Sequence, residues 1–271
     1  MPELPEVETI ARDLRQELVG SEFRSIVTTH DKSVIPGVDE FTVIRDQRVQ
    51  RVDRRGKFLL LFFDNDYVVT IHLRMSGRIL LRPHHEDALR FERHRLDFDR
   101  TSLRFCDSRK FGRLWISHID NYEQETGIWK LGIEPFSKGF DSQYFKNLVK
   151  GKRGTVKKIL LDQSLVAGIG NIYADEACFY SKVRPDARIE EIDEAKLEDL
   201  YAAILKALNQ GIRKRGTSIS DFQDAYGKMG SNQELLYVYG RGGQPCMECK
   251  SPLVRTKVAG RGTVYCESCQ G

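Results

Sequence analysis

The sequence predicts a multidomain α+β protein with three parts. An antiparallel β-sandwich or barrel comes first, a helical domain follows, and a small metal-binding module ends the chain. Three observations lead to this prediction: strand-like runs fill residues 23–118, helical spacing dominates residues 142–213, and four cysteines lie in the last 26 residues. A length of 271 residues is enough to bury more than one core.

The opening stretch, MPELPEVETIARDL, predicts a helix near residues 5–19. Pro5 suits the first helical turn, where a missing N–H costs nothing, and early glutamates complement the helix dipole. Apolar residues then follow at helical spacing, as in Ile10 and Leu14. A helix start does not explain Pro2 and Glu3, which lie outside it.

Six runs rich in β-branched or aromatic residues predict the strands of the first domain. Gly, Asp and Asn turns separate them, and short strands at this spacing are typical of an antiparallel sandwich or barrel. The predicted strands are 23–30, 57–63, 67–73, 78–82, 102–106 and 113–118.

The second half of the chain has helical spacing. The predicted helices are 142–150, 155–163, 171–181 and about 193–213. The polar, Gly-containing stretch 217–232 is too long for an ordinary connection, and such loops are often functional. We predict domains at 1–131, 132–240 and 241–271.

Charge and hydropathy indicate the class of protein. The net charge is +4, and the basic residues gather in three segments: Arg45, Arg48, Arg51, Arg54, Arg55 and Lys57; Lys150, Lys152, Arg153, Lys157 and Lys158; and Arg213, Lys214 and Arg215. Such segments fit a surface that follows a phosphate backbone, although solvated faces beside acidic neighbours would look alike. Because no apolar run approaches the roughly 20 residues of a membrane span and no secretory signal opens the chain, we expect a cytosolic protein without membrane contact.

Two C-x2-C pairs form the strongest local signal. They are Cys246 with Cys249 and Cys266 with Cys269, a spacing typical of one tetrahedral zinc ion held by four thiolates. Two disulfides are the alternative, which a cytosolic chain disfavours. The residues between the pairs predict two strands, 253–258 and 263–266, with Arg261 at the turn. The remaining cysteines, Cys106 and Cys178, are predicted to be core residues.

Two further stretches indicate nucleic-acid contacts. In QSLVAGIGNIYADEA (163–177), glycines allow close backbone approach, and Asn171 is predicted as the N-cap of a helix whose N–H groups bind phosphate. A tight helix–turn–helix without a ligand would have the same pattern. In HLRMSG (72–77) and DSRKFG (107–112), Met and Phe can act as wedges and Arg can bond an orphaned base, although core residues are the commoner interpretation.

Together these pieces resemble bacterial formamidopyrimidine-DNA glycosylase, the oxidised-purine repair family, over essentially the whole chain. The matching stretches are PELPEVET, RRGKFLLL, HLRMSG, DSRKFG, LVAGIGNIYADE and the cysteine module with AGRGTVYC. The resemblance implies an N-terminal β-sandwich, a helical domain with a helix–two-turn–helix motif and a C-terminal zinc ribbon. Double-stranded DNA with oxidised bases or abasic sites would bind in the cleft between them, with the protein as a monomer.

The resemblance also implies residue roles. Pro2 would be the nucleophile, Glu3 the acid and Glu6 a supporting carboxylate. Lys57 would contact the lesion's phosphate and act in β-elimination, and Arg261 would bind phosphate and assist δ-elimination. The DNA contacts would be His72, Met75, Arg93, Arg109, Phe111, Arg153 and Asn171, of which Met75, Arg109 and Phe111 fill the gap left by the flipped nucleotide. Residues 217–232, which we call the lid segment, would cover the extruded base.

Two features bear on substrate preference. Relatives that excise oxidised pyrimidines fill the gap from a single loop of the pattern Gln-Leu-Tyr, which HLRMSG does not match, so the purine type is preferred. The chain also departs from the family where many members read His-Asp-His, since it has Arg93-His94-Arg95.

The chemistry of Pro2 accounts for the opening residues. Removal of Met1 would expose a secondary amine, and an α-amino group has a pKa of about 8, so a useful fraction is unprotonated near neutrality. Attack on the anomeric carbon would release the base and give an iminium that acidifies the neighbouring C–H. Glu3 would protonate the sugar ring oxygen. The alternatives are a glycosylase for oxidised pyrimidines and a non-catalytic damaged-DNA-binding protein of the same fold.

Overall fold

The computed structural model describes residues 1–219 and 221–271. Contacts between residues divide the chain into two compact units, which are described separately. The first comprises Met1–Trp129 and Ile212–Gln233, and the second comprises Lys130–Gly211 and Glu234–Gly271. The predicted three-part division at 131 and 240 remains a prediction.

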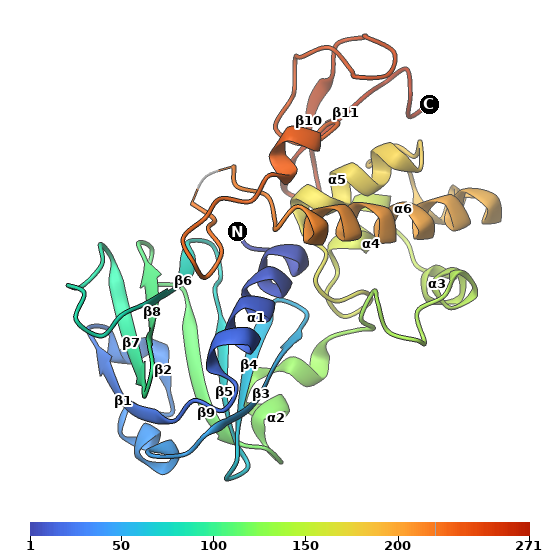
Figure 1. Cartoon of the computed structure of the whole chain (residues 1–271). Helices are drawn as coiled ribbons and strands as arrows, with labels where there is room; N and C mark the ends of the chain where they lie inside the picture. Colours follow the sequence, from blue (N-terminus) through green and yellow to red (C-terminus); the bar gives the residue numbers. More distant parts are fainter. Residues whose placement is uncertain (220) are drawn as a thin grey trace. The chain divides into compact units, whose positions relative to one another are not determined.

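The first unit is the predicted β-sandwich (Figure 1). One sheet has the order β1-β7-β8-β6 and the other β2-β9-β5-β4-β3. The first sheet contains β1 (Phe23–Thr28), β6 (Gly77–Arg82), β7 (Glu92–Phe98) and β8 (Ser102–Asp107); the second contains β2 (Val34–Ile35), β3 (Val49–Arg55), β4 (Phe58–Phe63), β5 (Tyr67–His72) and β9 (Arg113–His118). Every pairing is antiparallel except the short parallel pair β2–β9.

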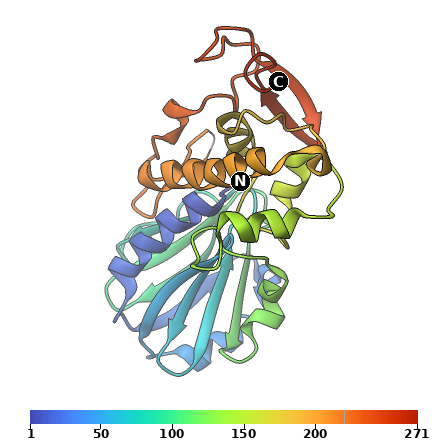
Figure 2. The same ribbon diagram turned by 90° about the vertical axis from the view of Figure 1, so that its right-hand side faces the viewer.

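Helix α1 (Leu4–Leu18) packs beside β3 and completes the core of this unit. Figure 2 shows the blue helix alongside the strands of that sheet. Its apolar side chains, Val7, Ile10, Ala11, Leu14 and Leu18, lie in one buried cluster with Phe23, Leu61 and Phe105 from the strands. The helix predicted at 5–19 is therefore confirmed, and burial of one face fixes its orientation on the sandwich.

Three strands of the first unit were not predicted from the sequence: the two-residue β2 and the longer β3 and β7. β3 and β7 carry mostly charged residues. In β3 only Val49 and Val52 are buried, and in β7 burial alternates, as at Leu96 and Phe98. Their pairing with β4 and β8 accounts for the strand conformation, because the ladder satisfies the backbone whatever the exposed side chains are. The strands at 57–63, 67–73, 78–82, 102–106 and 113–118 are found within one residue of the predicted ends.

The second unit is helical and ends in a hairpin. Its helices are α3 (Ser142–Val149), α4 (Val156–Leu161), α5 (Asn171–Tyr180) and α6 (Glu194–Arg213), of which the last two residues belong to the first unit. The short helix α2 (Tyr122–Thr126) precedes them in the first unit. The hairpin consists of β10 (Val254–Val258) and β11 (Arg261–Tyr265), and the cysteines flank it. The predicted α+β multidomain class is confirmed.

No helix in the described part of the chain is long and apolar enough to span a membrane.

Candidate functional site

The site begins at the first residues of the chain, in the first unit. Pro2, Glu3 and Glu6 are buried, whereas Met1 is 49% exposed. Glu3 is the N-cap of α1, and its backbone N–H donates to Glu6 Oε2 at 2.9 Å, as in a capping box. Glu6 Oε1 accepts the backbone N–H of Thr217 at 2.8 Å. One carboxylate therefore holds both the residue after Pro2 and the first residue of the lid segment.

Lys57 lies at the β3–β4 turn and is buried. Gly56 before it has φ +56°, a left-handed conformation that favours glycine. The turn is tied to α1 by Arg54, whose Nε donates to Glu8 Oε2 at 3.0 Å and whose Nη1 donates to the Gly56 carbonyl at 3.0 Å. The first turns of α1 and the Lys57 turn are thus fixed to one another through a single guanidinium.

His72 ends β5, in register with Phe58, and its ring meets the Phe58 ring edge-on at 4.5 Å. Burial, helped by the charges of Arg74 and Lys57, lowers the pKa of His72 to about 3. The ring is therefore neutral at pH 7. Because Nδ1 accepts the Arg74 backbone N–H at 3.0 Å, the proton lies on Nε2, which is left to donate a hydrogen bond.

Met75 and Phe111 lie on two loops of the first unit that meet at one carboxylate. Both side chains are exposed, so the interpretation of them as core residues is wrong. Asp107 accepts the Ser76 hydroxyl at 2.5 Å and the backbone N–H groups of Arg109 at 3.1 Å and Gly112 at 2.8 Å. The Arg109 guanidinium lies 5.0 Å from the Phe111 ring centroid. Two rigid loops thus present a methionine, an arginine and a phenylalanine to solvent.

The Arg93-His94-Arg95 stretch lies in β7. Arg93 Nε donates to the carbonyl of Asp107 at 2.8 Å, so its guanidinium lies where the loop with Arg109 begins. His94 is fully buried, with its ring nitrogens 2.8 Å from Ser33 Oγ and 3.0 Å from Thr28 Oγ1. Burial lowers the pKa of His94 to about 4, which leaves it a neutral structural residue.

In the second unit, Asn171 and Arg261 are brought together by the hairpin. Asn171 Nδ2 donates to the carbonyl of Gly262 at 3.0 Å. Asn171 is the first residue of α5 and Gly170 is its N-cap, so the N-cap prediction for Asn171 is wrong by one position. Arg261 pairs with Val258 and begins β11 rather than standing at the turn, which Ala259 and Gly260 make. Its side chain is exposed.

The hairpin is anchored by a buried ion pair that the sequence did not reveal. Lys157 and Asp175 have fully buried side chains, and Lys157 Nζ lies 2.5 Å from Asp175 Oδ1. Lys157 also donates to Thr263 Oγ1 at 2.7 Å and to the Gly262 carbonyl at 3.1 Å. The interpretation of Lys157 as part of a basic surface is therefore wrong. Arg153, by contrast, is exposed in the loop before α4.

The four cysteines of the C-terminal module fit one zinc ion. Their Sγ atoms all lie within 4.8 Å of one another, with 3.4 Å for Cys249–Cys266 and 3.9 Å for Cys246–Cys269. These separations are far longer than a disulfide bond of about 2.05 Å and suit four thiolates around an ion at about 2.3 Å. The predicted structural zinc site is confirmed, and four ligands leave no position for a reacting water. Cys106 and Cys178 are buried, as predicted.

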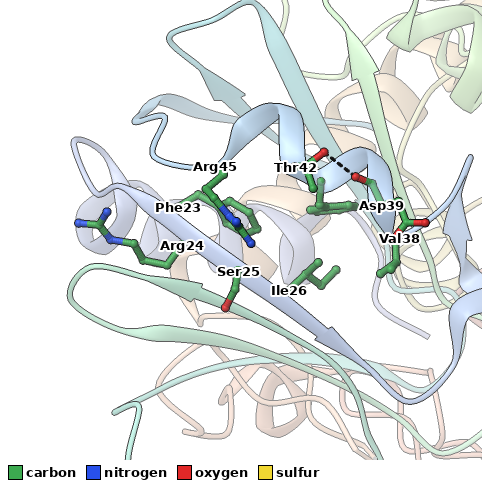
Figure 3. A pocket seen from close by; sticks show the side chains of 9 residues that line it. Phe23, Arg24, Ser25, Ile26, Val38, Asp39, Thr42 and Arg45 are labelled. Atoms are coloured by element: carbon green, nitrogen blue, oxygen red, sulfur yellow. Dashed lines mark hydrogen bonds between the residues drawn. The ribbon is translucent and has the colours of Figure 1, made fainter.

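The first unit also has a surface pocket (Figure 3). Between β1 and the 3-10 helix Asp39–Ile44, it is lined by Phe23, Arg24, Ser25, Ile26, Val38, Asp39, Phe41, Thr42 and Arg45. None of the predicted site residues lines it. The pocket is therefore separate from the predicted catalytic and DNA-binding groups.

Sequence reasoning missed Asp107 and the pair Lys157–Asp175, although all three lie in stretches that it quoted. An aspartate directly before two exposed loop residues was the available signal for Asp107, because such carboxylates often accept loop N–H groups. Asp175 lies 18 positions after Lys157, in a different helix, so no local pattern joins them.

Comparison with known proteins extends this picture. The domain described as "Formamidopyrimidine-DNA glycosylase N-terminal domain" matches residues 1–114, the "Formamidopyrimidine-DNA glycosylase H2TH domain" matches 131–223, and the "Zinc finger found in FPG and IleRS" matches 243–271. A formamidopyrimidine-DNA glycosylase from Desulfitobacterium hafniense is 39% identical over the full length of both chains, and one from Gloeobacter violaceus is 41% identical over all of this chain and 98% of its own. Two Lactococcus lactis Fpg structures, one with Fapy-dG-containing DNA and one with abasic-site DNA, are each 33% identical with a TM-score of 0.93 over 99% of both chains.

Proposed function

Because the chain belongs to the formamidopyrimidine-DNA glycosylase family, we propose a residue-by-residue account of how it repairs DNA. The protein is a base-excision-repair glycosylase for oxidised purines with abasic-site lyase activity, and its partner is DNA with lesions or abasic sites, as the sequence predicted. The observation that carries the assignment of roles is the buried start of α1, where Glu6 holds the backbone of Glu3 directly after Pro2.

The first step uses Pro2 as nucleophile. An exposed Met1 is accessible to removal, which would leave the Pro2 nitrogen as a secondary amine. Its lone pair attacks the anomeric carbon of the damaged nucleotide, and the C–N bond to the base breaks. The base leaves with the bonding pair and takes up the proton that the Pro2 nitrogen loses. Glu3 protonates the sugar ring oxygen, so that the ring opens to an iminium. Glu6 acts through Glu3, whose backbone it orients.

Strand cleavage follows from the iminium. Its positive charge acidifies the neighbouring sugar C–H, and loss of that proton expels the 3′ phosphate in β-elimination. Lys57 contacts the lesion's phosphate and takes part in this step, while Arg261 binds phosphate and assists δ-elimination at the 5′ side. Burial of Lys57 in a turn fixed to α1 supports its assignment, and the exposed guanidinium on an anchored hairpin supports that of Arg261.

The remaining site residues bind the DNA. His72 Nε2 donates to a phosphate, and Asn171, Arg93 and Arg153 contact the backbone, which suits their positions on fixed elements. Met75, Arg109 and Phe111 fill the gap left by the flipped nucleotide. Since these three side chains come from two loops joined by Asp107, the arrangement supports purine excision over the single-loop arrangement of pyrimidine enzymes.

The cellular setting is a further part of the proposal. The protein is DNA-associated, and we infer that it works as a monomer on chromosomal DNA in the bacterial cytoplasm. Similarity to proteins from two bacteria over nearly the full length of both chains supports the bacterial setting. Analytical ultracentrifugation of the free protein and cell fractionation test it, and a stable dimer or a membrane-bound fraction would contradict it.

Excision assays test the proposed function. Wild-type protein should release 8-oxoguanine from a duplex with cytosine opposite the lesion and leave a cleaved strand. Glu3→Gln should retain DNA binding but lose excision, because the acid is removed and the backbone is unchanged. Glu40→Gln, at an exposed position away from α1, is the matched control and should behave as wild type. Absence of purine excision by the wild type, or faster excision of oxidised pyrimidines, would contradict the proposal.

A further inference from the structure

The lid segment is fastened to α1 by a charge cluster that none of the proposed steps uses. Arg215 lies just before the segment, and its Nη2 lies 2.7 Å from both Asp13 Oδ2 and Asp224 Oδ2. Asp13 belongs to α1, whereas Asp224 lies in the middle of the lid segment. One guanidinium, placed just before the segment, therefore joins the middle of the segment to α1, the helix capped by Glu3.

Both carboxylates are deeply buried, and each has a second task. The Asp13 and Asp224 side chains are 5% and 2% exposed. Asp13 Oδ2 also accepts the backbone N–H of Ala225 at 3.2 Å, and Asp224 Oδ1 accepts those of Tyr226 at 3.0 Å and Lys228 at 2.8 Å. Asp224 thus builds the turn 224–228, and Asp13 holds that turn against α1.

The same turn is fixed on its other side by β6. The Leu81 backbone N–H donates to the Ala225 carbonyl at 2.8 Å, and Ala225 and Phe222 lie in the core of the first unit. In Figure 1 the orange segment after α6 runs beside β6 and the start of α1. Its two ends are also joined directly, since Ser231 N donates to the Lys214 carbonyl at 2.9 Å.

The exposed residues of the segment contrast with this anchored half. Ile219 is 52% and Met229 is 64% exposed, while Ala225 is fully buried. The segment is thus a loop on a fixed base rather than a loop free along its whole length. If the segment covers an extruded base, its exposed residues, such as Ile219 and Met229, are available for that contact, and residues 222–228 form the support. Ser220 lies outside the described residues.

We propose that Arg215, through Asp13 and Asp224, is a positioning residue that holds the lid segment in place for recognition of the damaged base. This inference rests on the proposed function. Without Arg215, two buried carboxylates would face one another without a cation, and the turn 224–228 would leave α1. Base excision needs the lid against the extruded base, whereas an abasic site presents no base. The arginine therefore serves excision and not strand cleavage.

Comparison of two activities in one protein tests the proposal. Arg215→Ala should slow single-turnover excision of 8-oxoguanine roughly tenfold, because two buried carboxylates lose their cation. The effect is not larger because Arg215 is half exposed, so solvent screens part of its interaction with them. Cleavage of a duplex with a preformed abasic site should stay within about twofold of wild type, because Pro2 and Lys57 are untouched. Arg215→Lys should restore excision to within about threefold, since an ammonium replaces the cation but not the fork geometry.

Arg24→Ala is the matched control. Arg24 also contacts two carboxylates, Glu22 and Asp46, and is 48% exposed against 47% for Arg215, but neither carboxylate belongs to α1 or to the lid segment. It should leave both activities unchanged. If Arg215→Ala does not fold, the positioning role is tested with Arg215→Lys and Asp13→Asn. The measured quantity is then the rate of 8-oxoguanine excision divided by the rate of cleavage at a preformed abasic site.

Parallel loss of both activities, or no loss of either, would overturn the positioning role in a protein whose wild type is active. A wild type that excises no purine lesion would overturn the proposed function itself, and this inference with it.

Discussion

Removal of the buried lysine that anchors the zinc hairpin, Lys157→Met, should destabilise the second unit strongly. The Lys157 and Asp175 side chains are fully buried, so solvent does not screen the loss. The variant leaves a buried carboxylate without its cation and removes the bonds to Thr263 and Gly262. Loss of one partner of such a pair costs about 3–5 kcal/mol in the free energy of unfolding.

The pH dependence of unfolding separates this effect from a simple packing defect. Burial raises the pKa of Asp175 from 3.8 to about 7, and Lys157 opposes the shift. The folded state therefore holds more protons than the unfolded state between these values, and the stability that Asp175 contributes falls as the pH rises from about 4 to about 7. In Lys157→Met the folded pKa rises further, so the fall should continue above pH 7 at about 1.4 kcal/mol per pH unit.

Urea unfolding of the zinc-loaded protein measures both effects. Lys158→Met, which removes an exposed neighbour on the same helix, is the control and should cost little. The double variant Lys157→Met, Asp175→Leu should recover most of the loss, because an apolar pair does not bury an unpaired charge. A cost below about 1 kcal/mol for Lys157→Met, or equal costs for the single and double variants, would refute this reasoning.

Three other predictions concern zinc, opposite-base preference and pH. Cys249→Ser should release zinc and weaken DNA binding, because the hairpin with Arg261 loses its support. Zinc analysis and a DNA titration measure these two effects. Full zinc content in the variant would contradict a four-cysteine site. Arg109→Ala should reduce the preference for a lesion opposite cytosine by about 1–3 kcal/mol. Excision rates against the four opposite bases measure this preference. An unchanged ranking of the four bases would show that Arg109 has a structural role. Since the pKa of His72 is about 3, DNA affinity should show no step from this residue between about pH 5 and 8. Fluorescence anisotropy of wild type and His72→Gln should give parallel pH profiles; a step that the substitution removes would show that His72 titrates.

Much of the fold followed from local pattern. The strands with buried apolar runs, such as Phe58–Phe63, and the helix from Leu4 carry their own periodicity, and the cysteine spacing alone identified zinc. β3 and β7 were missed because their exposed faces are charged, so the strand state depends on partners elsewhere in the chain. A pattern read in one window does not contain that information.

The site divides in the same way. The motif that contains Pro2, Glu3 and Glu6 could be recognised, whereas the exposure of Met75 and Phe111 depends on how two loops meet at Asp107. Lys157 and Arg215 were grouped with surface charges because their neighbours in sequence are basic. Their carboxylate partners come from other elements, and the burial of Lys157 and of the carboxylates that bind Arg215 is a property of the folded chain.

Covalent trapping tests the central claim, that the Pro2 nitrogen forms the iminium, most directly. Borohydride added during reaction with 8-oxoguanine DNA should reduce the iminium to a stable amine and link protein to DNA at a one-to-one ratio. Mass spectrometry should place the adduct on the N-terminal peptide, and a tag ahead of Pro2 should abolish it, because an amide nitrogen has no nucleophilic lone pair. An adduct on Lys57, or none when Pro2 is free, would contradict the mechanism.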